Sequence, residues 1–406
     1  MENNRQNILL AVCGSISAYR SIDIARGLVN AGHSVRVILT SGAQKFVLPQ
    51  VYRYLGMEVY CDQDDFNPQG GQAILHMDLS RWCDRLVIAP LSANTLAKLA
   101  YAAADDLLST TFLALPEETP RIIFPAMNTR MLNNSLVEKN LQTIRKLKNT
   151  FIHPPAFGEL ACGELGEGKL PDTEKIVEIV PIINFSSNSQ KKILISSGAT
   201  VAPMDSVRYL TNPSSGITGF FLAKEALSRG YQVVLVAGIN STRKIDFLEG
   251  IGNCRVHKVA TTRDAFAVIK QEIQDAEAYL SSAAMGDIEF PIHRGKIKKE
   301  DLQDVVPVRQ SIDILSHVLK EKRKGQKIVG FAAETELTEE MMRMKWEKKP
   351  VDLLVGTVVD NGLMGDVIKG FGEVSTKYNL FKNGEIVFSG TLNKQDLACE
   401  ILNRIF

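Results

Sequence analysis

The first constraint on this chain is a run of apolar residues with no polar position that could face water. Residues 8–12 read Ile-Leu-Leu-Ala-Val, and such an unbroken run is typical of a strand buried on both faces of a parallel sheet. A turn of small residues follows, then a helical pattern through Ile22, Ile24 and Leu28, and a second strand pattern at residues 35–40. This βαβ order predicts an α/β domain with a mostly parallel sheet.

A second α/β pattern begins in the other half of the chain. Residues 192–200 predict a strand that runs into a further turn of small residues, and apolar runs at residues 233–236 and 278–280 continue a sheet. Before this half, residues 185–190 are polar and show no periodicity, which is typical of a linker. The sequence therefore predicts two Rossmann-like three-layer α/β domains with mostly parallel sheets, one on each side of the linker.

The expected domains span residues 1–184 and 191–406. A helical pattern over residues 172–183, with Asp172 as its N-cap, closes the first domain. A chain of 406 residues has the length of two or three domains of ordinary size, so the expected division leaves no large segment without a core.

Bulk composition excludes several classes of function. Hydrophobic residues make up 45% of the chain, charged residues 23%, and the formal net charge is +1, so no global charge attracts nucleic acid or an anionic membrane. The six cysteines form no Cys-x-x-Cys pair, which argues against a structural zinc site and favours a reducing compartment. No uncharged apolar run approaches the ~18 residues that cross a bilayer. We expect a cytoplasmic protein without a signal peptide.

The turn after the first strand suits a phosphate group. Free backbone amides are expected at the start of the following helix, beside the hydroxyls of Ser15 and Ser17. The turn has one glycine, Gly14, where the dinucleotide fingerprint requires three. A mononucleotide such as FMN therefore fits better than a dinucleotide. A tight turn that binds no ligand is an equally good interpretation of this stretch alone.

Polar clusters follow two further strand patterns, at residues 91–95 and 125–128. The carboxyl ends of parallel strands are where open α/β sheets bind ligands. Asn128 offers donors and an acceptor that suit a carboxylate or an amide, and His76 is the nearby histidine that could titrate usefully. Taken singly, a turn asparagine and a packed histidine are the commoner explanations.

A single cysteine, Cys162, lies in a segment with four glycines at residues 158–168. Glycine is conformationally permissive, so this loop could close over a site and reopen. The carboxylates of Glu159, Glu164 and Glu167 flank the thiol and favour its protonated form, which indicates a proton donor rather than a thiolate nucleophile. A surface turn with an incidental cysteine is the alternative.

Four motifs of the first half match one known family in order and spacing, and on them the chain resembles the flavin-dependent cysteine decarboxylases. The motifs are Gly14-Ser15-Ile16-Ser17-Ala18, Pro90-Leu91-Ser92-Ala93-Asn94-Thr95, Pro125-Ala126-Met127-Asn128 and Gly158-Glu159-Leu160-Ala161-Cys162-Gly163. The resemblance implies a flavodoxin-like domain that binds FMN and acts on a cysteine carboxylate. Two positions depart from it: Leu91 stands where the family usually has alanine, and Leu132 where related peptide decarboxylases often have an aromatic residue.

The resemblance also implies roles for individual residues. Cys162 corresponds to the proton donor of the reductive step, His76 to the base or the catalyst beside FMN, and Asn128 to the anchor of the substrate carboxylate. FMN would oxidise the substrate thiol, so that CO2 leaves from a thioaldehyde, and would then return the electrons. The implied FMN contacts are Gly14, Ser15, Ser17, Thr40, Ser92, Asn94, Thr95 and Ser109.

In the second half, two features suit a polyanion. Ser214 and Ser215 are candidate caps of a helix start with free amides, although a capped helix without a ligand is the plainer interpretation. Three lysines, Lys296, Lys298 and Lys299, lie within four residues. Most such charge runs are solvated surface. Beside a turn of serine and glycine, a triphosphate is the better hypothesis.

This half resembles the phosphopantothenate–cysteine ligases. The matching residues are Ser197-Gly198-Ala199-Thr200, Asp205, Val207-Arg208, Asn212-Pro213-Ser214-Ser215-Gly216, Ala283-Ala284, Asp287, Lys296-Ile297-Lys298-Lys299, Gly330-Phe331-Ala332-Ala333-Glu334-Thr335, Lys345, Lys349 and Asp352. Three positions depart from the family: Ile217 replaces the usual lysine, Thr357 lies in a stretch that usually contains an asparagine, and Glu373 lies in a stretch that usually reads Ser-Asp. These departures bear on nucleotide affinity or selectivity.

For the ligase half the resemblance implies that the carboxylate of 4′-phosphopantothenate attacks CTP, and that cysteine then displaces CMP from the acyl-cytidylate. Asn212 corresponds to the residue that stabilises this intermediate, and Lys296 is implied in catalysis as well, with Mg²⁺ as partner of the triphosphate. No metal ligand is assigned. The implied CTP contacts are Asp287, Lys296, Ser311, Ile312, Asp313, Ile314, Phe331, Lys345 and Lys349.

Taken together, the two halves resemble the bacterial bifunctional enzymes of coenzyme A biosynthesis. The resemblance implies CTP-dependent ligation of L-cysteine to 4′-phosphopantothenate, then FMN-dependent decarboxylation to 4′-phosphopantetheine and CO2. It also implies a homo-oligomer with trimeric flavin domains, in which FMN lies at subunit contacts, and dimeric ligase domains. Two alternatives stay open: a stand-alone decarboxylase of peptides whose second half serves assembly, and a non-catalytic flavoprotein that regulates a partner.

Overall fold

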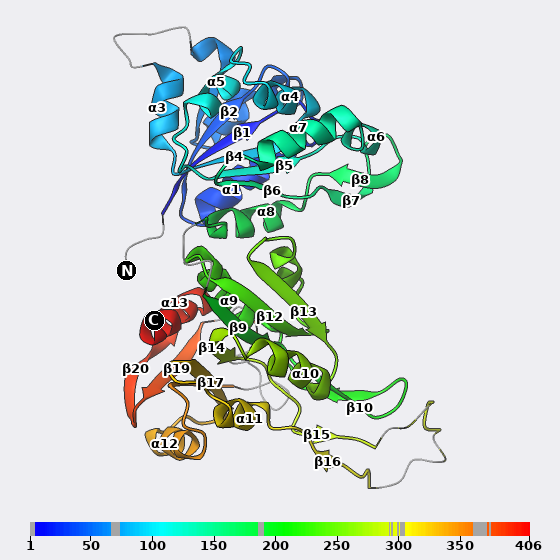
Figure 1. Cartoon of the computed structure of the whole chain (residues 1–406), viewed down its shortest axis with the longest axis vertical. Helices are drawn as coiled ribbons and strands as arrows, with labels where there is room; N and C mark the ends of the chain where they lie inside the picture. The colour runs from blue at the N-terminus through cyan, green and yellow to red at the C-terminus, as the bar shows by residue number, and fades with distance from the viewer. Residues whose placement is uncertain are drawn as a thin grey trace. The chain divides into compact units, whose positions relative to one another are not determined.

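The computed structural model describes residues 5–65, 74–185, 191–291, 293, 295–298, 300, 305–359, 372 and 375–406. The chain divides into two compact units, Met1–Phe185 and Ser186–Phe406, and each has its own sheet (Figure 1). Residues 186–190 of the expected linker, Lys299 and Glu373 lie outside the described residues. In the described ranges, no helix is long and apolar enough to span a membrane.

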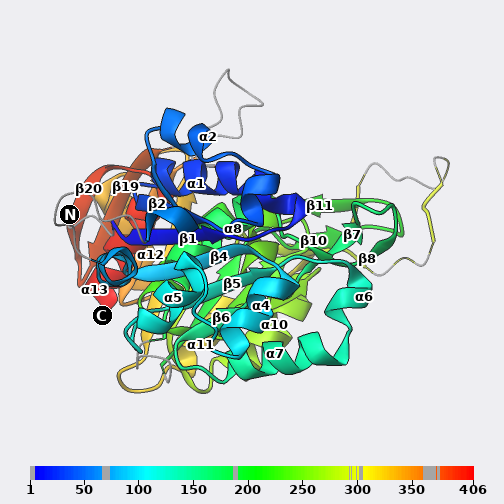
Figure 2. The ribbon, with the colours of Figure 1, turned by 90° about the horizontal axis from the view of Figure 1, so that it is seen from above.

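In the first unit the described strands form one six-stranded sheet, whose neighbouring strands are all parallel. Its order is β3-β2-β1-β4-β5-β6, and Figure 2 shows β2, β1, β4, β5 and β6 next to one another. The strands are β1 (Asn7–Val12), β2 (Ser34–Leu39), β3 (Glu58–Cys61), β4 (Arg85–Leu91), β5 (Arg121–Pro125) and β6 (Thr150–Ile152). This doubly wound order has its topological switch point between β1 and β4. The expected Rossmann-like three-layer fold is confirmed.

Helices cover both faces of this sheet (Figure 1). On one face α1 packs against α8, and on the other α3 packs against α5 and α4 against α7. The helices are α1 (Ser21–Asn30), α2 (Pro49–Tyr54), α3 (Leu75–Trp82), α4 (Ala93–Ala100), α5 (Leu107–Ala114), α6 (Thr129–Leu132), α7 (Ser135–Arg145) and α8 (Thr173–Ile179). A two-stranded antiparallel hairpin, β7 (Ala156–Glu159) and β8 (Leu165–Lys169), extends beside α6 (Figure 1).

The closing helix is shorter than expected. It ends at Ile179, and a 3-10 turn at Val180–Ile182 completes the helical pattern. Asp172 occupies the N-cap position, but its side chain makes no capping hydrogen bond. Instead it forms an ion pair with Arg20, 3.6 Å between Nη2 and Oδ1. The charge of Asp172 is thus directed at a neighbouring segment rather than at its own helix amides.

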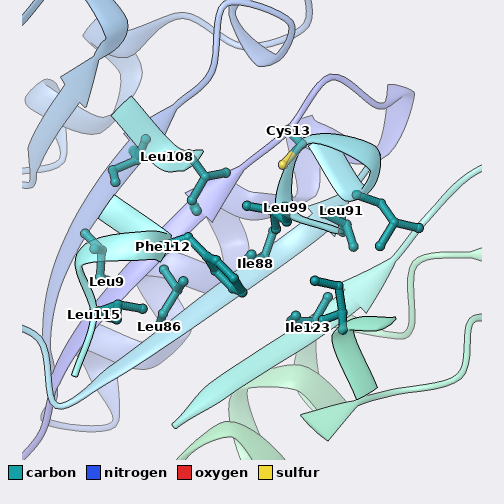
Figure 3. Close-up of a cluster of buried hydrophobic side chains, with 14 of the residues drawn as sticks. Leu9, Cys13, Leu86, Ile88, Leu91, Leu99, Leu108, Phe112, Leu115 and Ile123 are labelled. Carbon is teal, nitrogen blue, oxygen red and sulfur yellow. The ribbon is translucent and has the colours of Figure 1, made fainter. Parts of the chain in front are cut away.

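The core of the first unit lies between the sheet and the helices α4 and α5. Figure 3 shows side chains of β1, β4 and β5 packed with Leu99, Leu108 and Phe112 of these helices. Leu91, one of the two departures from the decarboxylase family, is fully buried in this cluster, and Leu132 is only 8% exposed in it. Both side chains therefore serve the core, because burying an apolar side chain of this size stabilises the fold by about 1.5–3 kcal/mol.

In the second unit the described strands form an eight-stranded sheet of order β13-β12-β9-β14-β17-β18-β19-β20. The pairs from β13 to β18 are parallel and those of β18, β19 and β20 are antiparallel. The strands are β9 (Lys192–Ser197), β12 (Gln232–Gly238), β13 (Cys254–Val259), β14 (Ala276–Ser281), β17 (Lys327–Glu334), β18 (Leu353–Val358), β19 (Thr376–Lys382) and β20 (Glu385–Leu392). The mostly parallel sheet expected for this half is confirmed.

Helices and two short antiparallel pairs complete the described part of the second unit. The helices are α9 (Ile217–Ser228), α10 (Thr262–Glu272), α11 (Ile314–Lys320), α12 (Glu339–Lys348) and α13 (Lys394–Ile405). The short pairs join β10 (Val201–Pro203) to β11 (Tyr209–Thr211) and β15 (Ile288–Glu289) to β16 (Arg309–Gln310). The expectation that Ser214 or Ser215 caps α9 is wrong. Gly216 holds the N-cap position at φ +75°, a left-handed conformation that glycine adopts without strain.

One buried histidine gives the first unit a dependence on pH. His153 follows β6, is 5% exposed, and stacks on Phe124 with ring centroids 5.6 Å apart. Its Nδ1 lies 2.5 Å from the Pro154 carbonyl oxygen, and its Nε2 is buried without a hydrogen-bond partner. Burial, helped by the positive charge of Lys175, lowers the pKa of His153 to about 4.

Stability should therefore be lost in acid. In the unfolded chain His153 binds a proton near pH 6.5, whereas in the folded chain it does so only near pH 4. The contribution of neutral His153 to the free energy of unfolding is therefore complete above pH 6.5 and decreases as the pH falls from 6.5 to 4. We expect about 2 kcal/mol of this loss between pH 7 and pH 5. Denaturant unfolding at the two pH values should show a smaller loss for His153→Phe than for the wild type. The exposed His293→Phe variant is the control, and an equal loss in His153→Phe would contradict the account.

Candidate active sites

The first unit has a pocket of about 840 Å³ at the carboxyl ends of β1, β4 and β5. This is the switch point of the sheet, where doubly wound folds bind their ligands, and the volume suits a cofactor-sized molecule. The lining residues come from the turns after these strands and from the β7–β8 hairpin. They are Gly14, Ser15, Ile16, Ser17, Tyr19, Arg20, Ser92, Ala93, Ala126, Met127, Asn128, Met131, Glu159, Leu160, Ala161, Cys162, Gly168, Lys169 and Leu170.

Small residues bring the turns of the pocket close together. A Cβ atom on Gly14 would meet the backbone of Gly42 at 3.0 Å, so the turns after β1 and β2 touch through their glycines. The hydroxyl oxygens of Ser15 and Ser17 lie 3.0 Å apart, and Ser15 donates to the Ala126 carbonyl over 3.2 Å. The first turn is thereby tied to the turn after β5. Hydroxyl groups and backbone thus converge on one side of the pocket.

Four of the eight expected flavin contacts line this pocket, namely Gly14, Ser15, Ser17 and Ser92. The other four lie elsewhere in the unit. Thr40 donates to the Val12 carbonyl, Thr95 accepts from Ser92, Ser109 donates to the Asp106 carbonyl, and Asn94 is exposed. Three of these four hydroxyl or amide side chains therefore hold the turns around the pocket rather than facing it. Their expected flavin contacts stay predictions.

Asn128 caps the short helix α6 and is thereby fixed in orientation. Its Oδ1 accepts a hydrogen bond from the backbone amide of Arg130 at 2.8 Å. The amide nitrogen Nδ2 is left to point at the hairpin, where it lies 3.3 Å from the sulfur of Cys162. A cap that uses the carbonyl oxygen presents the donor end of the amide to the pocket. That orientation suits a carboxylate.

The hairpin that carries Cys162 is docked through two glycines. A Cβ atom on Gly168, at φ +137°, would overlap the Met127 carbonyl oxygen, and one on Gly166 would overlap the hydroxyl of Thr129. In this space the amide of Met127 donates to the Gly168 carbonyl at 3.0 Å. The expected loop is thus a hairpin anchored beside Asn128. Only its tip, closed by a hydrogen bond from Leu160 N to the Glu164 carbonyl at 2.9 Å, carries the thiol.

Cys162 and Asn128 meet at the pocket, as the sequence interpretation requires. Cys162 is exposed, whereas Cys13 in the first turn is buried, and burial raises the pKa of the Cys13 thiol to about 11. The Cys162 thiol donates to Oε2 of Glu164 over 3.6 Å, and this oxygen also accepts from Asn128 at 3.4 Å. The thiol thus donates a hydrogen bond to a carboxylate at the edge of the pocket, which is the geometry of a proton donor.

His76 lies apart from these residues. It begins the first turn of α3 and is not among the residues that line the pocket. Its Nδ1 is 3.0 Å from Oδ1 of Asp65, a carboxylate whose side chain is 2% exposed. A buried carboxylate on Nδ1 orients the ring and leaves Nε2 as the atom for proton transfer. Within one chain the structure does not bring His76 to Cys162.

In the second unit, three turns crowd together at the start of α9. Cβ atoms on Gly198 and Gly216 would meet the hydroxyl of Ser241, and Gly219 leaves room for Ser197. The Ser197 hydroxyl donates to the Gly216 carbonyl at 2.8 Å. Such glycine-lined turns at the carboxyl ends of parallel strands let a ligand approach the backbone closely. Ile217, the first residue of α9, is 4% exposed, so this departure from the ligase family packs into the core.

The segment with Lys296 is pinned by a buried carboxylate. Asp205 accepts hydrogen bonds from the backbone of Val207, Arg208 and Ile297, and from Nε of Arg208 at 3.0 Å. These bonds, the Arg208 side chain first, hold the pKa of Asp205 well below its usual range. Lys296 itself is exposed and adjacent to the pinned Ile297. The turn after β10 thus fixes the backbone from which this lysine projects.

Asn212 and the other expected nucleotide contacts spread over several turns. Asn212 is exposed and donates to the Ala284 carbonyl at 3.3 Å, which joins the turn after β11 to the turn after β14. The Asp287 carbonyl accepts from the amide of Ser311 at 2.8 Å. Ile314 is buried, and Ile312 packs against the same cluster, so their side chains serve the core.

Two expected lysines are paired with carboxylates. Lys345 contacts Glu334 at the end of β17, and Lys349 lies 2.7 Å from Asp313, the N-cap of α11. Burial alone would raise the pKa of Asp313, but the Lys349 ammonium and the amide of Ser316 lower it. Phe331, another expected nucleotide contact, lies on β17 and is half-buried.

One departure from the ligase family and one expected ligand class remain to be placed. Thr357, the described departure on β18, donates to the Lys377 carbonyl of β19 at 3.4 Å, so its hydroxyl serves the sheet. In the described part of the chain, no group of three or more His, Cys, Asp or Glu side chains is arranged to hold a metal ion.

A doubly wound sheet with a ligand-sized pocket at its switch point is typical of proteins that bind nucleotide cofactors. In the second unit, the turns at the start of α9 likewise approach one another through glycines. Comparisons with known proteins narrow this class. The family described as Flavoprotein matches residues 1–183. The family described as the DNA/pantothenate metabolism flavoprotein C-terminal domain matches residues 188–406.

Relatives match along the whole chain. The coenzyme A biosynthesis bifunctional protein CoaBC of Bacillus subtilis is 35% identical over 416 residues, which cover 100% of this chain and 97% of the relative. The protein of the same name from Escherichia coli K12 is 32% identical and covers 98% of this chain and 95% of the relative. Among solved structures, the C-terminal domain of a CoaBC protein is 26% identical, with a TM-score of 0.42, covering 54% of this chain and 96% of that chain.

The chain therefore belongs to the family of bifunctional coenzyme A biosynthesis enzymes, which join a decarboxylase domain to a phosphopantothenate–cysteine ligase domain. The resemblance read from the sequence is confirmed. A match over the full length decides against a stand-alone peptide decarboxylase, since the second half is a ligase domain. It also decides against a non-catalytic regulator.

Sequence reasoning did not find Met131, Lys169 or Arg130. Met131 and Lys169 line the pocket because α6 and β8 lie side by side, and Arg130 reaches the tip of the hairpin, where it contacts Glu164. No spacing in the sequence predicts a contact between segments so far apart in the chain. The glycines at 166 and 168 are the available signal, because a strand with alternate glycines indicates close approach of another backbone.

Gly168→Ala should selectively impair the decarboxylase. The added Cβ would overlap the Met127 carbonyl, and the positive φ adds strain, so the hairpin should move away from Asn128. We expect decarboxylation to slow at least about tenfold, which corresponds to about 1.4 kcal/mol, with ligase activity of the same chain unchanged.

The matched control is Gly158→Ala in the same hairpin, whose Cβ would meet Lys169 Cδ at an ordinary 3.4 Å. It should retain both activities. Wild-type decarboxylation by Gly168→Ala would show that the close approach is not needed.

Proposed function

We propose that the second unit ligates L-cysteine to 4′-phosphopantothenate with CTP, and that the first unit uses FMN to decarboxylate the product to 4′-phosphopantetheine. The observation that carries the proposal is the meeting of Asn128 and Cys162, 3.3 Å between Nδ2 and Sγ, in a pocket of cofactor size. Asn128 suits the carboxylate that leaves as CO2, and Cys162 would supply the proton that replaces it. The family match supports the order of the two reactions.

The residues of the pocket fit a flavin mononucleotide. The hydroxyls of Ser15, Ser17 and Ser92 offer hydrogen bonds to a phosphate or to a flavin edge, and Gly14 leaves the backbone accessible. Ala93 and Ala126 provide small apolar walls for a flat ring. FMN in this place would supply two-electron oxidation of the substrate thiol and would return the electrons after CO2 is lost.

The protein's own groups would then act at two atoms of the substrate. Asn128 would donate through Nδ2 to the cysteine carboxylate and hold it at the pocket wall. Loss of CO2 leaves an enethiol, and its conversion to the product thiol needs a proton on carbon together with the two electrons that the flavin would return. The Cys162 thiol, carried to the pocket by the hairpin tip, would donate this proton and would be reprotonated from solvent. Its exposure suits the second step.

His76 would act in the pocket of a neighbouring copy. Its ring is oriented by Asp65, yet it does not line the pocket of its own chain. A homo-oligomer whose flavin domains form trimers would resolve this separation if α3 of one subunit lies beside the pocket of the next. His76 would then take a proton beside the flavin. Dimeric ligase domains would complete the proposed assembly.

In the second unit, CTP would bind along the turns at the carboxyl end of the sheet. Lys296, on the backbone pinned by Asp205, would meet the triphosphate. Lys345 and Lys349 would exchange their carboxylate partners for phosphate oxygens, which is feasible because partly exposed ion pairs are weak. Mg²⁺ would enter with the nucleotide, held mainly by phosphate oxygens.

Asn212 would stabilise the acyl-cytidylate. Its amide donates to the Ala284 carbonyl, so a ligand oxygen near this turn could replace that acceptor without moving the backbone. A neutral donor suits an intermediate in which negative charge gathers on the phosphate and the acyl oxygen.

Cys162→Ser should stop the decarboxylase after CO2 release. A serine hydroxyl is a much weaker acid than a thiol, so reprotonation of the enethiol should slow by at least about a hundredfold. We expect flavin to remain bound and the enethiol to accumulate, as seen by mass spectrometry. Complete turnover to 4′-phosphopantetheine at the wild-type rate would refute the role of Cys162.

Co-expression of this variant with His76→Asn serves as its control. If the pocket takes Cys162 from one chain and His76 from another, random assembly restores about one site in four. Decarboxylation by the mixture, with neither variant active alone, is the expected result. Two inactive variants that do not complement each other would contradict the shared site.

Asn212→Asp should impair the ligase and spare the decarboxylase. A carboxylate in this position would repel the developing negative charge of the acyl-cytidylate, and we expect turnover to fall at least about tenfold. Pyrophosphate release and amide formation measure the effect. Asn383→Asp, in the exposed β19–β20 turn at the opposite end of the sheet, is the matched control. Unchanged ligase kinetics in Asn212→Asp would count against the assignment.

A further inference from the structure

We propose that Arg130 and Asn128 together bind the carboxylate of the acyl-cysteine substrate, and that the Glu164 carboxylate takes the place of the substrate carboxylate when no substrate is bound. The proposal rests on the function proposed above, in which the first unit decarboxylates an acylated cysteine. One juxtaposition carries it: two hydrogen-bond donors from the start of α6 meet on a single carboxylate from the β7–β8 hairpin.

The carboxylate of Glu164 is held at both oxygens. Arg130 Nη2 donates to Oε1 at 3.0 Å, and Asn128 Nδ2 donates to Oε2 at 3.4 Å. The Cys162 thiol also donates to Oε2, over 3.6 Å. Because Glu164 is itself a carboxylate, these contacts show that the two donors can converge on one group with the size, shape and charge of an amino-acid carboxylate.

Asn128 is positioned independently of Glu164. Asn128 uses its Oδ1 to cap α6 through the amide of Arg130 at 2.8 Å, so only its donor end is available to a ligand. Arg130 lies two residues later, in α6, and its guanidinium reaches the same Glu164 carboxylate. A helix cap and a planar, always charged guanidinium are both suited to an anionic, two-oxygen partner. Asn128 would remain in place when Glu164 leaves, and the exposed Arg130 side chain is free to follow the incoming carboxylate.

Glu164 is held weakly enough to leave. The side chain of Arg130 is 84% exposed and that of Glu164 is 46% exposed, and ion pairs so open to water are weak and screened by salt. Asp205 in the second unit is the contrast, because it is buried and accepts from three backbone amides as well as from Arg208. The first carboxylate can be exchanged, whereas the second is fixed.

Exchange conserves the charge of the site. Substrate carboxylate and Glu164 cannot both pair fully with Arg130, since two anions on one guanidinium repel each other. The position vacated by Oε2 adjoins Asn128 and Cys162, which both line the pocket, whereas Arg130 and Glu164 lie beside them outside its lining. After CO2 is lost the product has no carboxylate to hold this site. Glu164 would then return, and the site would distinguish substrate from product.

The experiment measures ligand binding by calorimetry on the full-length, flavin-loaded enzyme. One probe is 4′-phosphopantothenoyl-L-serine, in which a hydroxyl replaces the thiol, so that no oxidation follows. The other is 4′-phosphopantothenoyl-ethanolamine, which has no carboxylate. Arg130→Gln should weaken the serine probe about tenfold and leave the ethanolamine probe unchanged.

Glu164→Gln should have the opposite effect on the affinity for the serine probe. Without the internal carboxylate, the binding-competent state needs no exchange, and the serine probe should bind about threefold to tenfold more tightly. The ethanolamine probe should bind as it does to the wild type. Glu167→Gln, which removes a carboxylate from the same hairpin, is the matched control and should change neither affinity.

Weaker or unchanged binding of the serine probe to Glu164→Gln would overturn the proposal. So would an Arg130→Gln variant that loses affinity for both probes equally, because this would show a general structural effect. Failure of the proposed function looks different: the wild type would not prefer the serine probe, and Asn128→Leu would bind it as the wild type does. In that case the proposed role of Arg130 would be wrong together with the proposed decarboxylase site.

Discussion

The close approach of the β7–β8 hairpin to the turn after β5 governs the decarboxylase site. Gly168 makes room for the Met127 carbonyl, and its own carbonyl accepts from the Met127 amide at 3.0 Å. Through this contact the Cys162 thiol reaches Asn128, which lies 34 positions earlier in the chain. A side chain between the two backbones would separate Cys162, the proposed proton donor, from Asn128, the proposed carboxylate anchor.

Both units combine fixed and exchangeable electrostatic contacts. Two carboxylates with buried side chains act as supports. Asp65 in the first unit contacts the backbone amide and the ring of His76, and Asp205 in the second accepts from three backbone amides, one of them beside Lys296. Partly exposed ion pairs, such as that of Lys349 with Asp313, cost little to break. The backbone supports are therefore fixed, whereas the side chains proposed to bind anionic ligands are paired with carboxylates that a ligand can replace.

Much of the fold could be predicted from the sequence, because strands buried on both faces leave unbroken apolar runs such as residues 8–12. Helix starts were harder: the left-handed φ of Gly216 leaves no mark that distinguishes it from a serine cap nearby. Within the site, Gly14, Ser15 and Cys162 reach the pocket, but Ser109 is used inside the fold. The contact of Arg130 with Glu164 was out of reach, since it depends on how two distant segments pack.

The central claim is that one pocket, walled by the turns after β1, β4 and β5 and by the hairpin, holds both FMN and the carboxylate of the acyl-cysteine. A crystal structure of the flavin-loaded enzyme with 4′-phosphopantothenoyl-L-serine tests it most directly. The account predicts flavin against Gly14 and Ser92, and the ligand carboxylate within hydrogen-bonding distance of Asn128 Nδ2, beside Cys162. A flavin or a ligand carboxylate bound away from these residues would contradict it.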